Sequence, residues 1–100
     1  MDATQLAAQK HSGLAGKAAF VTGGATGIGF AIARALAAQE ITVVIADVDL
    51  GAAQKAAEGL GAGHGAIRVD VRDRASVEDA FAKAVVLTGG IDICIANAGV

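Results

Sequence analysis

Apolar, β-branched runs that recur along the chain constrain its fold more than any other feature. They begin near residues 18, 41, 66 and 91, and each interval between them holds one segment with the apolar spacing of a helix. Strands that alternate with helices at this spacing are joined by right-handed crossovers and therefore lie parallel. The sequence predicts an α/β fold, an open, doubly wound parallel sheet of which these runs form the first four strands.

The boundaries of the elements follow from the same runs. We expect strands at 18–22, 41–46, 66–71 and 91–96, and helices from residue 28 onward, at 50–60 and at 75–87. On the first helix, the helical spacing predicts one apolar face, which consists of Ile28, Ile32, Ala35 and Leu36. On the third helix, the same spacing predicts a face of Val77, Phe81 and either Ala84 or Val85. The expected cap of that helix is Asp73 or Ser76.

The composition fits this fold and excludes several classes of protein. Hydrophobic residues make up 54% of the 100 residues and charged residues 18%, as expected for strands buried on both faces. The longest uncharged run, between Lys17 and Arg34, holds 16 residues including four glycines, whereas a bilayer span needs about 20 mainly apolar residues. The net charge is −2, and the sequence has neither a basic patch nor a set of stacking aromatics. We expect neither a membrane nor a nucleic acid as partner.

The cysteine and histidine residues suggest no metal or disulfide chemistry. Cys94 is the single cysteine, so no disulfide forms within the chain, and the N-terminus lacks the pattern of a secretory signal. We therefore expect a cytoplasmic protein. Cys94 lies mid-strand and is expected to be a small buried side chain. His11 and His64 lack metal-ligand spacing and are expected to be solvated loop residues, and residues 72–74 to form a solvated corner.

A glycine-rich turn joins the first strand to the first helix. Gly23, Gly27 and Gly29 form G-x-x-x-G-x-G directly after the strand and directly before the helix. Glycine permits positive φ and a close approach of the backbone to a pyrophosphate, which the helix N-terminus attracts. A P-loop is excluded because Phe30 stands where its lysine must be, and G-x-G-x-x-G fails at Ile32. The alternative is an ordinary glycine turn.

An acidic residue ends the second strand. Asp47 lies 18 residues after Gly29, close to the position of an acid that binds the adenosine ribose in dinucleotide-binding sheets. Its carboxylate would accept hydrogen bonds from both ribose hydroxyls and would repel a 2′-phosphate. Val48 and Asp49 follow, without a basic residue, so the position favours NAD over NADP. The alternative is a solvated loop acid, and we expect Asp49 to be that or a helix cap.

These motifs together resemble the opening of the short-chain dehydrogenases/reductases. The glycine loop of that family, T-G-x-x-x-G-[IL]-G, stands here as Thr22–Gly29 after Leu14–Lys17. Asp70–Val71 is similar to the Asp-Val pair of the family, and Ile95–Gly99 resembles its N-N-A-G motif, with alanine at the first asparagine. The resemblance covers Leu14–Val100. It implies that residues 14–100 are a Rossmann-type, NAD(P)-binding half-domain that stops before the catalytic region. It also implies that residues 1–13 are a leader.

The resemblance also implies roles for individual residues. It places five residues of the glycine turn and helix start at the pyrophosphate, namely Gly23, Thr26, Gly27, Ile28 and Gly29. At the adenosine ribose it places Asp47 and Val48, and at the adenine Asp70 and Val71. At the nicotinamide-side ribose it places Asn97, Ala98 and Gly99. Thr22 is expected to tie the loop to the fourth strand.

No catalytic residue can be assigned in this chain. The chemistry of the family uses a Tyr-x-x-x-Lys pair and a serine, but the chain has no tyrosine, and Ser12 and Ser76 lie outside the expected site. We expect part of a longer, homo-oligomeric enzyme that moves a hydride between NAD(H) and an alcohol or ketone. Alone, the chain should be inactive and prone to associate along its fourth strand.

Three alternatives stay open. The first is an NADPH-dependent enzyme of the 3-oxoacyl carrier-protein reductase type, which Asp47 disfavours. The second is a methyltransferase, whose acid at the same strand end would hold the ribose of S-adenosylmethionine. The third is a nucleotide-binding module without catalysis.

Overall fold

The computed structural model describes residues 16–97, in which strands and helices alternate along the chain. The strands are β1 (Ala18–Thr22), β2 (Thr42–Asp47), β3 (Gly65–Arg68) and β4 (Ile93–Ala96). The helices are α2 (Gly27–Ala38), α3 (Leu50–Leu60) and α4 (Arg74–Thr88). The predicted element order is confirmed.

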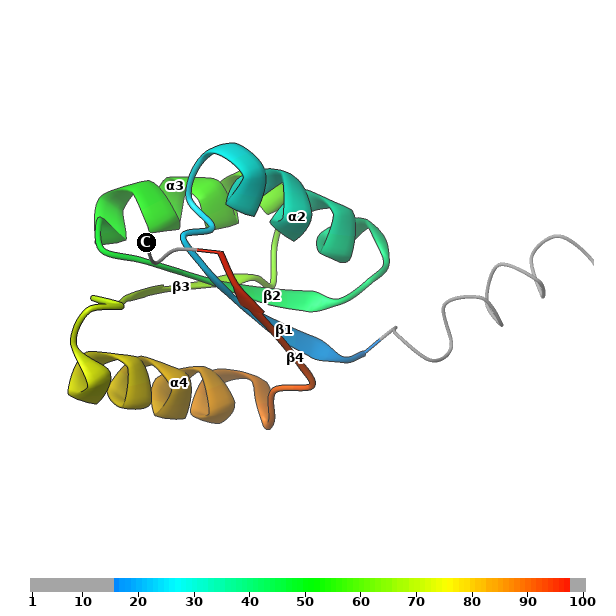
Figure 1. The fold of residues 1–100 in the computed structure, drawn as a ribbon. Helices are drawn as coiled ribbons and strands as arrows, with labels where there is room; N and C mark the ends of the chain where they lie inside the picture. The colour runs from blue at the N-terminus through cyan, green and yellow to red at the C-terminus, as the bar shows by residue number, and fades with distance from the viewer. Residues whose placement is uncertain (1–15, 98–100) are drawn as a thin grey trace, which may run out of the picture.

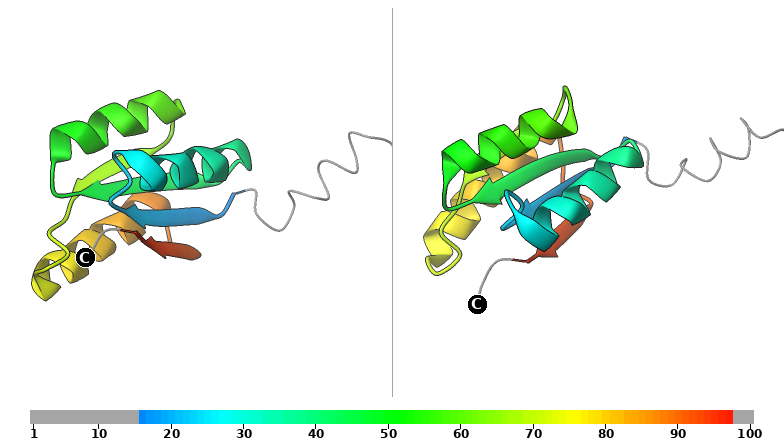
Figure 2. Two further views of the ribbon diagram at one scale, coloured as in Figure 1. Left: turned by 45° about the horizontal axis from the view of Figure 1, so that its top comes forward. Right: turned by 90° about the horizontal axis from the view of Figure 1, so that it is seen from above.

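The strands form one parallel sheet in the order β3-β2-β1-β4. Because β1 lies between two neighbours, Phe20 pairs with Val44 on one side and with Cys94 on the other. Figure 1 shows α2 and α3 on one face of the sheet and α4 on the other, and the view from above in Figure 2 shows α2 and α3 lying over the strands. The predicted doubly wound sheet is therefore confirmed.

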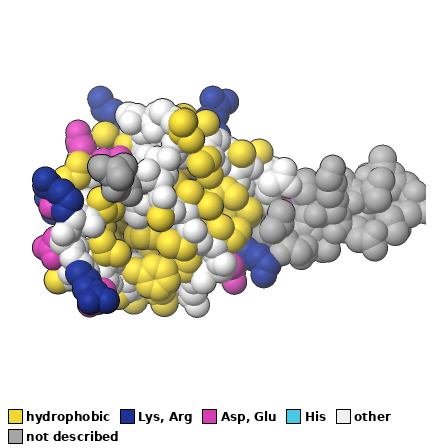
Figure 3. All heavy atoms as spheres, viewed as in Figure 1, with side chains coloured by type: hydrophobic (Ala, Val, Ile, Leu, Met, Phe, Trp, Pro, Cys, Tyr) yellow, Lys and Arg dark blue, Asp and Glu magenta, His cyan; other side chains and the backbone are white. Residues whose placement is uncertain are grey.

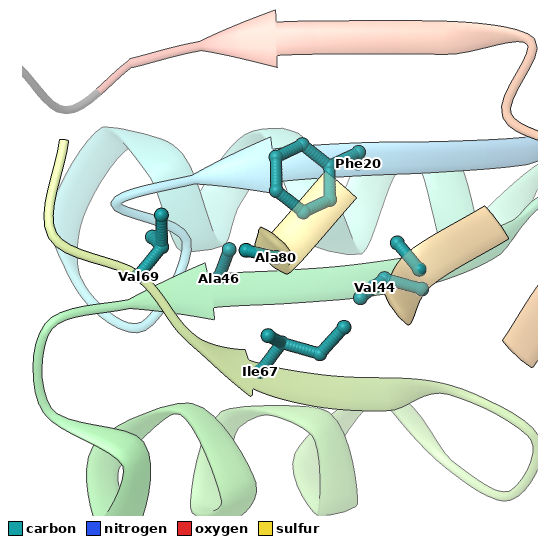
Figure 4. Close-up of a cluster of buried hydrophobic side chains, with 7 residues drawn as sticks. Phe20, Val44, Ala46, Ile67, Val69 and Ala80 are labelled. Carbon is teal, nitrogen blue, oxygen red and sulfur yellow. The ribbon is translucent and has the colours of Figure 1, made fainter. Parts of the chain in front are cut away.

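Each face of the sheet has its own apolar core, because side chains alternate between the two faces of a strand. The core beneath α4 consists of Phe20, Val44, Ala46, Ile67, Val69, Ala80 and Ala84 (Figure 4). The core beneath α2 and α3 consists of Val21, Ala33, Val43, Ile45, Ala53, Ala56 and Ala57. The helices contribute alanine to both cores, and the strands contribute the larger side chains.

Two strands are shorter than the apolar runs that predict them. β3 ends at Arg68 rather than at residue 71, although the Val69 N–H still donates to the Asp47 carbonyl over 2.9 Å. β4 begins at Ile93 rather than at residue 91, because the hydrogen bonds between β4 and β1 start at Asp92. The Asp92 N–H donates to the Ala18 carbonyl, and its carboxylate accepts from the Ala18 N–H, each over 2.9 Å.

The predicted face of the first helix is correct only for Leu36, which packs against the core, and is wrong for Ile28 and Ala35. In α2 the buried residues are Gly29 and Ala33, whereas Ile28 is 74% exposed and Ala35 is exposed. Small residues face the sheet because the start of α2 packs tightly against the preceding turn. Phe30, Leu36 and Ala37 complete the packing from the edges of that face. The face is thus rotated from the one that the largest apolar side chains predict.

The predicted face of α4 is correct only in part. Ala84 is buried as expected, but the other fully buried residue is Ala80. Phe81 stays 39% exposed and packs its ring edge against Phe20, with 5.7 Å between centroids and an interplanar angle of 78°. Val77 packs against the core at its margin.

Aspartates cap α3 and α4. The Asp49 carboxylate accepts from the Ala52 N–H over 3.0 Å, as expected of a helix cap. The Asp73 carboxylate accepts from the N–H groups of Ala75 and Ser76 over 3.0 and 3.4 Å. Asp73, and not Ser76, is therefore the N-cap of α4.

Cys94 and His64 differ from their expectations. Cys94 is exposed, because it points to the α4 side of the edge strand β4, where the packing of α4 leaves it open. His64 is half-buried rather than solvated, and its Nδ1 accepts from the Val43 N–H over 2.9 Å. The imidazole thus takes the place of a strand carbonyl just before β3 begins. Burial lowers the pKa of His64 below its ordinary value of 6.5.

This hydrogen bond predicts that stability falls in mild acid. A lowered folded-state pKa means that the unfolded chain takes up the proton more readily, so the contribution is complete above pH 6.5 and is lost as the pH falls below it. We expect the free energy of unfolding, measured with urea from about pH 7.5 to about pH 5, to decrease. The variant His64→Asn, whose amide oxygen accepts without titrating, should show a shallower decrease. Equal slopes for the two proteins would contradict the prediction.

Candidate functional site

The turn between β1 and α2 has a backbone that needs glycine. Gly23 and Gly27 have φ values of 64° and 60°, in the left-handed region. The Gly23 N–H donates to the Ala46 carbonyl over 2.8 Å, which fixes the turn to the end of β2. A Cβ on Gly29 would collide with the Gly23 carbonyl oxygen and lie 2.8 Å from the Asn97 amide nitrogen. The turn is therefore packed tightly against both the helix start and the end of β4.

The start of α2 keeps its backbone donors available to a ligand. Thr26, the N-cap residue, is extended and makes no side-chain cap hydrogen bond, and the first turn of the helix holds no acidic residue. The first N–H groups of a helix have no partner within it and lie at the positive end of its dipole. This arrangement suits the oxygens of a phosphate. Ile28 lies exposed beside these groups.

Asp47 lies between the glycine turn and the start of α3. Its Oδ2 accepts from the Ala25 N–H over 3.4 Å, and its Oδ1 accepts from the Asp49 N–H over 3.2 Å. The carboxylate is half-buried at the end of β2 and keeps further acceptor capacity on each oxygen. Val48 follows with 54% of its surface exposed. A sugar beside the turn would meet a carboxylate and an apolar side chain.

Asp70 follows β3 and is held by Arg72. Its Oδ1 accepts from the Arg72 Nε over 3.2 Å and its Oδ2 from Nη2 over 3.3 Å. These hydrogen bonds hold the pKa of the Asp70 carboxyl below its usual value. The Asp70 N–H donates to the Ser76 hydroxyl over 2.9 Å, and Val71 packs against the core at its margin. The corner at 72–74 is exposed, as expected, but the side chains of Arg72 and Asp73 are hydrogen-bonded and that of Arg74 is ion-paired.

The end of β4 reaches the glycine turn. The Thr22 hydroxyl donates to the Ile95 carbonyl over 3.3 Å and accepts from the Asn97 N–H over 3.2 Å. The Asn97 amide donates to the Gly23 carbonyl over 3.3 Å. The expected link between Thr22 and the fourth strand is confirmed, and Figure 1 shows the end of β4 close to the start of α2. Ala98 and Gly99, also predicted site residues, lie outside the described residues.

The predicted residues that the structure describes therefore meet at one edge of the sheet. The loop supplies backbone donors for an anion, Asp47 and Asp70 supply carboxylates at neighbouring strand ends, and Asn97 adds an amide. Ligands bind at this carboxyl edge in open α/β sheets. The close packing at Gly29 and the free helix start fit a dinucleotide. Arg72 and Ser76 also contact Asp70 at this edge, which their sequence-based assignments did not predict, although the spacing Asp-x-Arg was a signal for the first of them.

Comparisons with known proteins decide the family. A family model described as short chain dehydrogenase matches residues 17–100. The chain belongs to the short-chain dehydrogenase family. Its membership confirms the resemblance and favours an oxidoreductase over a methyltransferase.

The relatives of this short-chain dehydrogenase are longer than the chain itself. It is 44% identical to galactitol 2-dehydrogenase of Agrobacterium fabrum over 84% of its own length and 33% of that protein. It is 42% identical to sorbitol dehydrogenase of Cereibacter sphaeroides, over 85% and 33% of the two chains. An uncharacterized oxidoreductase of Bacillus subtilis is 41% identical, but the match covers 13% of it. The chain thus spans a third or less of these relatives.

A solved structure shares the fold. The hydroxysteroid dehydrogenase from Escherichia coli superposes with a TM-score of 0.80 at 32% identity, over 87% of this chain and 38% of that one. Its similarity confirms the parallel, Rossmann-type architecture. Within residues 16–97, no helix has both the length and the apolarity to cross a bilayer.

An apolar groove lies between α4 and the strands β1 and β4. It has a volume of about 490 Å³, and its apolar lining comes chiefly from Phe20, Val71, Val77, Phe81, Cys94 and Ala96. Figure 3 shows hydrophobic side chains gathered on this face of the molecule. The groove adjoins the carboxyl edge of the sheet, where β4 has a neighbour on one side only among the described strands.

Proposed function

We propose that this short-chain dehydrogenase uses NAD(H) in preference to NADP(H) to oxidise an alcohol or reduce a ketone. The carrying observation is the Asp47 carboxylate, which is fixed beside the glycine turn by the Ala25 N–H. A 2′-phosphate on the adenosine ribose would bring negative charge to this carboxylate. At an effective dielectric constant near 20, two like charges about 4 Å apart repel by up to about 4 kcal/mol before screening.

The residues would divide the work of holding the cofactor along the carboxyl edge. The N–H groups at the start of α2 bind the pyrophosphate, with Gly23, Thr26, Gly27, Ile28 and Gly29 around it. Asp47 and Val48 hold the adenosine ribose, and Asp70 and Val71 frame the adenine. Asn97, Ala98 and Gly99 approach the nicotinamide-side ribose. When bound, the nicotinamide supplies the hydride acceptor or donor.

Proton transfer needs a group that this chain lacks. The 100 residues contain no tyrosine, so under this proposal the acid–base residue comes from outside them. The substrate class is supported by relatives named for alcohols, such as galactitol, sorbitol and D-beta-hydroxybutyrate. We further propose a homo-oligomer in the cytoplasm.

Calorimetric titration with NADH and NADPH tests the proposal. We expect NADH to bind at least about tenfold more tightly, which corresponds to about 1.4 kcal/mol. Tighter binding of NADPH would instead support an enzyme of the carrier-protein reductase type. Tight binding of NADH without oxidation of any secondary alcohol, in a protein that also carries an acid–base residue, would support a nucleotide-binding module.

A further inference from the structure

The corner between β3 and α4 contains an arginine whose contacts are concentrated on one carboxylate. Arg72 contacts Asp70 through its backbone N–H at 3.0 Å, its Nε at 3.2 Å and its Nη2 at 3.3 Å. The first two donors go to Oδ1 and the third goes to Oδ2. Paired donors of this kind fix the plane of a carboxylate as well as its position.

The backbone of Asp70 is anchored independently of the arginine. Its N–H donates to the Ser76 hydroxyl over 2.9 Å, and its carbonyl accepts from the Asp73 N–H over 3.0 Å. Val71 beside it packs at the margin of the core. The remaining freedom of Asp70 therefore lies in its side chain, which is the part that Arg72 holds.

The position of Asp70 places it at the adenosine end of the proposed site. The Val69 N–H donates to the Asp47 carbonyl over 2.9 Å, so the chain before Asp70 runs alongside the end of β2. Asp47 itself accepts from Ala25 in the glycine turn. Two carboxylates thus follow neighbouring strands at one edge, and of the two Asp70 lies on the strand farther from that turn.

We propose that Arg72 is a positioning residue that sets the Asp70 carboxylate to accept a hydrogen bond from the amino group of the adenine. Each carboxylate oxygen offers about two acceptor sites. Arg72 fills both sites on Oδ1 and one on Oδ2, which leaves one site for an amino donor. This inference rests on the proposed function, and it assigns to Arg72 a role in recognising the base rather than the phosphates.

The Arg72–Asp70 pair contributes little to the stability of the fold. Its effect on binding can therefore be measured separately from any effect on folding. The Arg72 side chain is 86% exposed, and ion pairs that lie in solvent contribute little to the stability of the fold. The variant Arg72→Met should therefore fold normally. Because an unheld Asp70 side chain must be ordered on binding, we expect the affinity for NADH to fall about three- to tenfold.

A base-specific probe distinguishes positioning from a general loss of structure. Reduced nicotinamide hypoxanthine dinucleotide carries an oxo group where NADH carries the adenine amino group, and is otherwise the same ligand. We expect Arg72→Met to weaken binding of NADH but to leave the hypoxanthine analogue within about twofold. Asp70→Ala should do the same, and adding Arg72→Met to Asp70→Ala should cause no further loss. Arg72→Lys, with a single ammonium in place of the fork, should give an intermediate affinity.

Arg74→Met is the matched control. Arg74 is also exposed, but it pairs with Glu78 over 3.6 Å and makes no contact with Asp70. We expect this variant to bind both dinucleotides normally. An unchanged NADH affinity in Arg72→Met, or an equal loss for both dinucleotides, would overturn the proposed role of Arg72 and leave the proposed function standing. If the unchanged protein bound neither dinucleotide, the proposed function would fall and this inference with it. If Arg72→Met did not fold, Arg72→Lys would decide by the same comparison.

Discussion

Replacing Gly29 with alanine is expected to reduce the affinity for NADH by more than about tenfold, or about 1.4 kcal/mol, and to destabilise the fold. The added methyl group would collide with the Gly23 carbonyl oxygen and crowd the Asn97 amide. Backbone cannot move aside as a flexible side chain can, so the turn and the start of α2 must separate. Overpacking of this kind costs about 1–3 kcal/mol, and here it also displaces the donors that would bind the pyrophosphate. Calorimetric titration and urea unfolding measure the two effects.

Substitutions at two other glycines distinguish the effect of this collision from the general effect of adding a side chain to a glycine. Gly59→Ala in α3 meets only the Phe30 ring, at an ordinary 3.7 Å, and should stabilise the helix by up to about 1 kcal/mol without affecting binding. A Cβ at Gly27 meets no atom within 4 Å, but in Gly27→Val the backbone must keep a φ of 60° and the side chain projects into the expected pyrophosphate site. It should weaken binding at least about tenfold with the fold largely kept. Normal NADH affinity in Gly29→Ala would show that the turn has no part in binding.

The fold was predictable because buried parallel strands consist of uninterrupted apolar runs. The central run at 18–22 is buried throughout, and the parallel orientation of β2 and β4 on either side of it follows from the crossovers. The strand ends were less predictable, since hydrogen bonds decide them: Val69 and Ile91 are apolar but lie outside the strands. The helix faces also depend on tertiary packing, which selected Ala33 and Ala80 over larger neighbours.

The relative positions of the candidate site residues were predictable where a motif ties them to the end of a strand. The glycine turn and Asp47 occupy fixed places relative to strand ends, and the structure brings them together through the Ala25 N–H. Contacts of residues that belong to no such motif were not predictable in the same way. No local pattern shows that His64 accepts from Val43, or that Cys94 lies on the open side of β4.

Replacing Asp47 with alanine is expected to narrow the preference for NADH over NADPH, largely by weakening NADH. Hydrogen bonds from the ribose hydroxyls to a carboxylate are charge-assisted and worth about 1.5–3 kcal/mol, so NADH should bind about ten- to a hundredfold more weakly. NADPH makes no such bonds in the proposed site and loses a repulsion, so its affinity should be unchanged or higher. Titration of the variant with both cofactors measures the change.

Asp49→Ala provides the matched control, because it removes a carboxylate two residues away that caps α3 instead. Asp49 accepts from the Ala52 N–H, so its loss should cost about 1 kcal/mol of stability and leave the cofactor preference intact. Ionic strength gives a second test, since the repulsion of a 2′-phosphate by Asp47 is partly screened by salt. The preference of the unchanged protein should decrease as salt is added, and that of Asp47→Ala should change less. A preference that persisted undiminished in Asp47→Ala would place its origin elsewhere in the site.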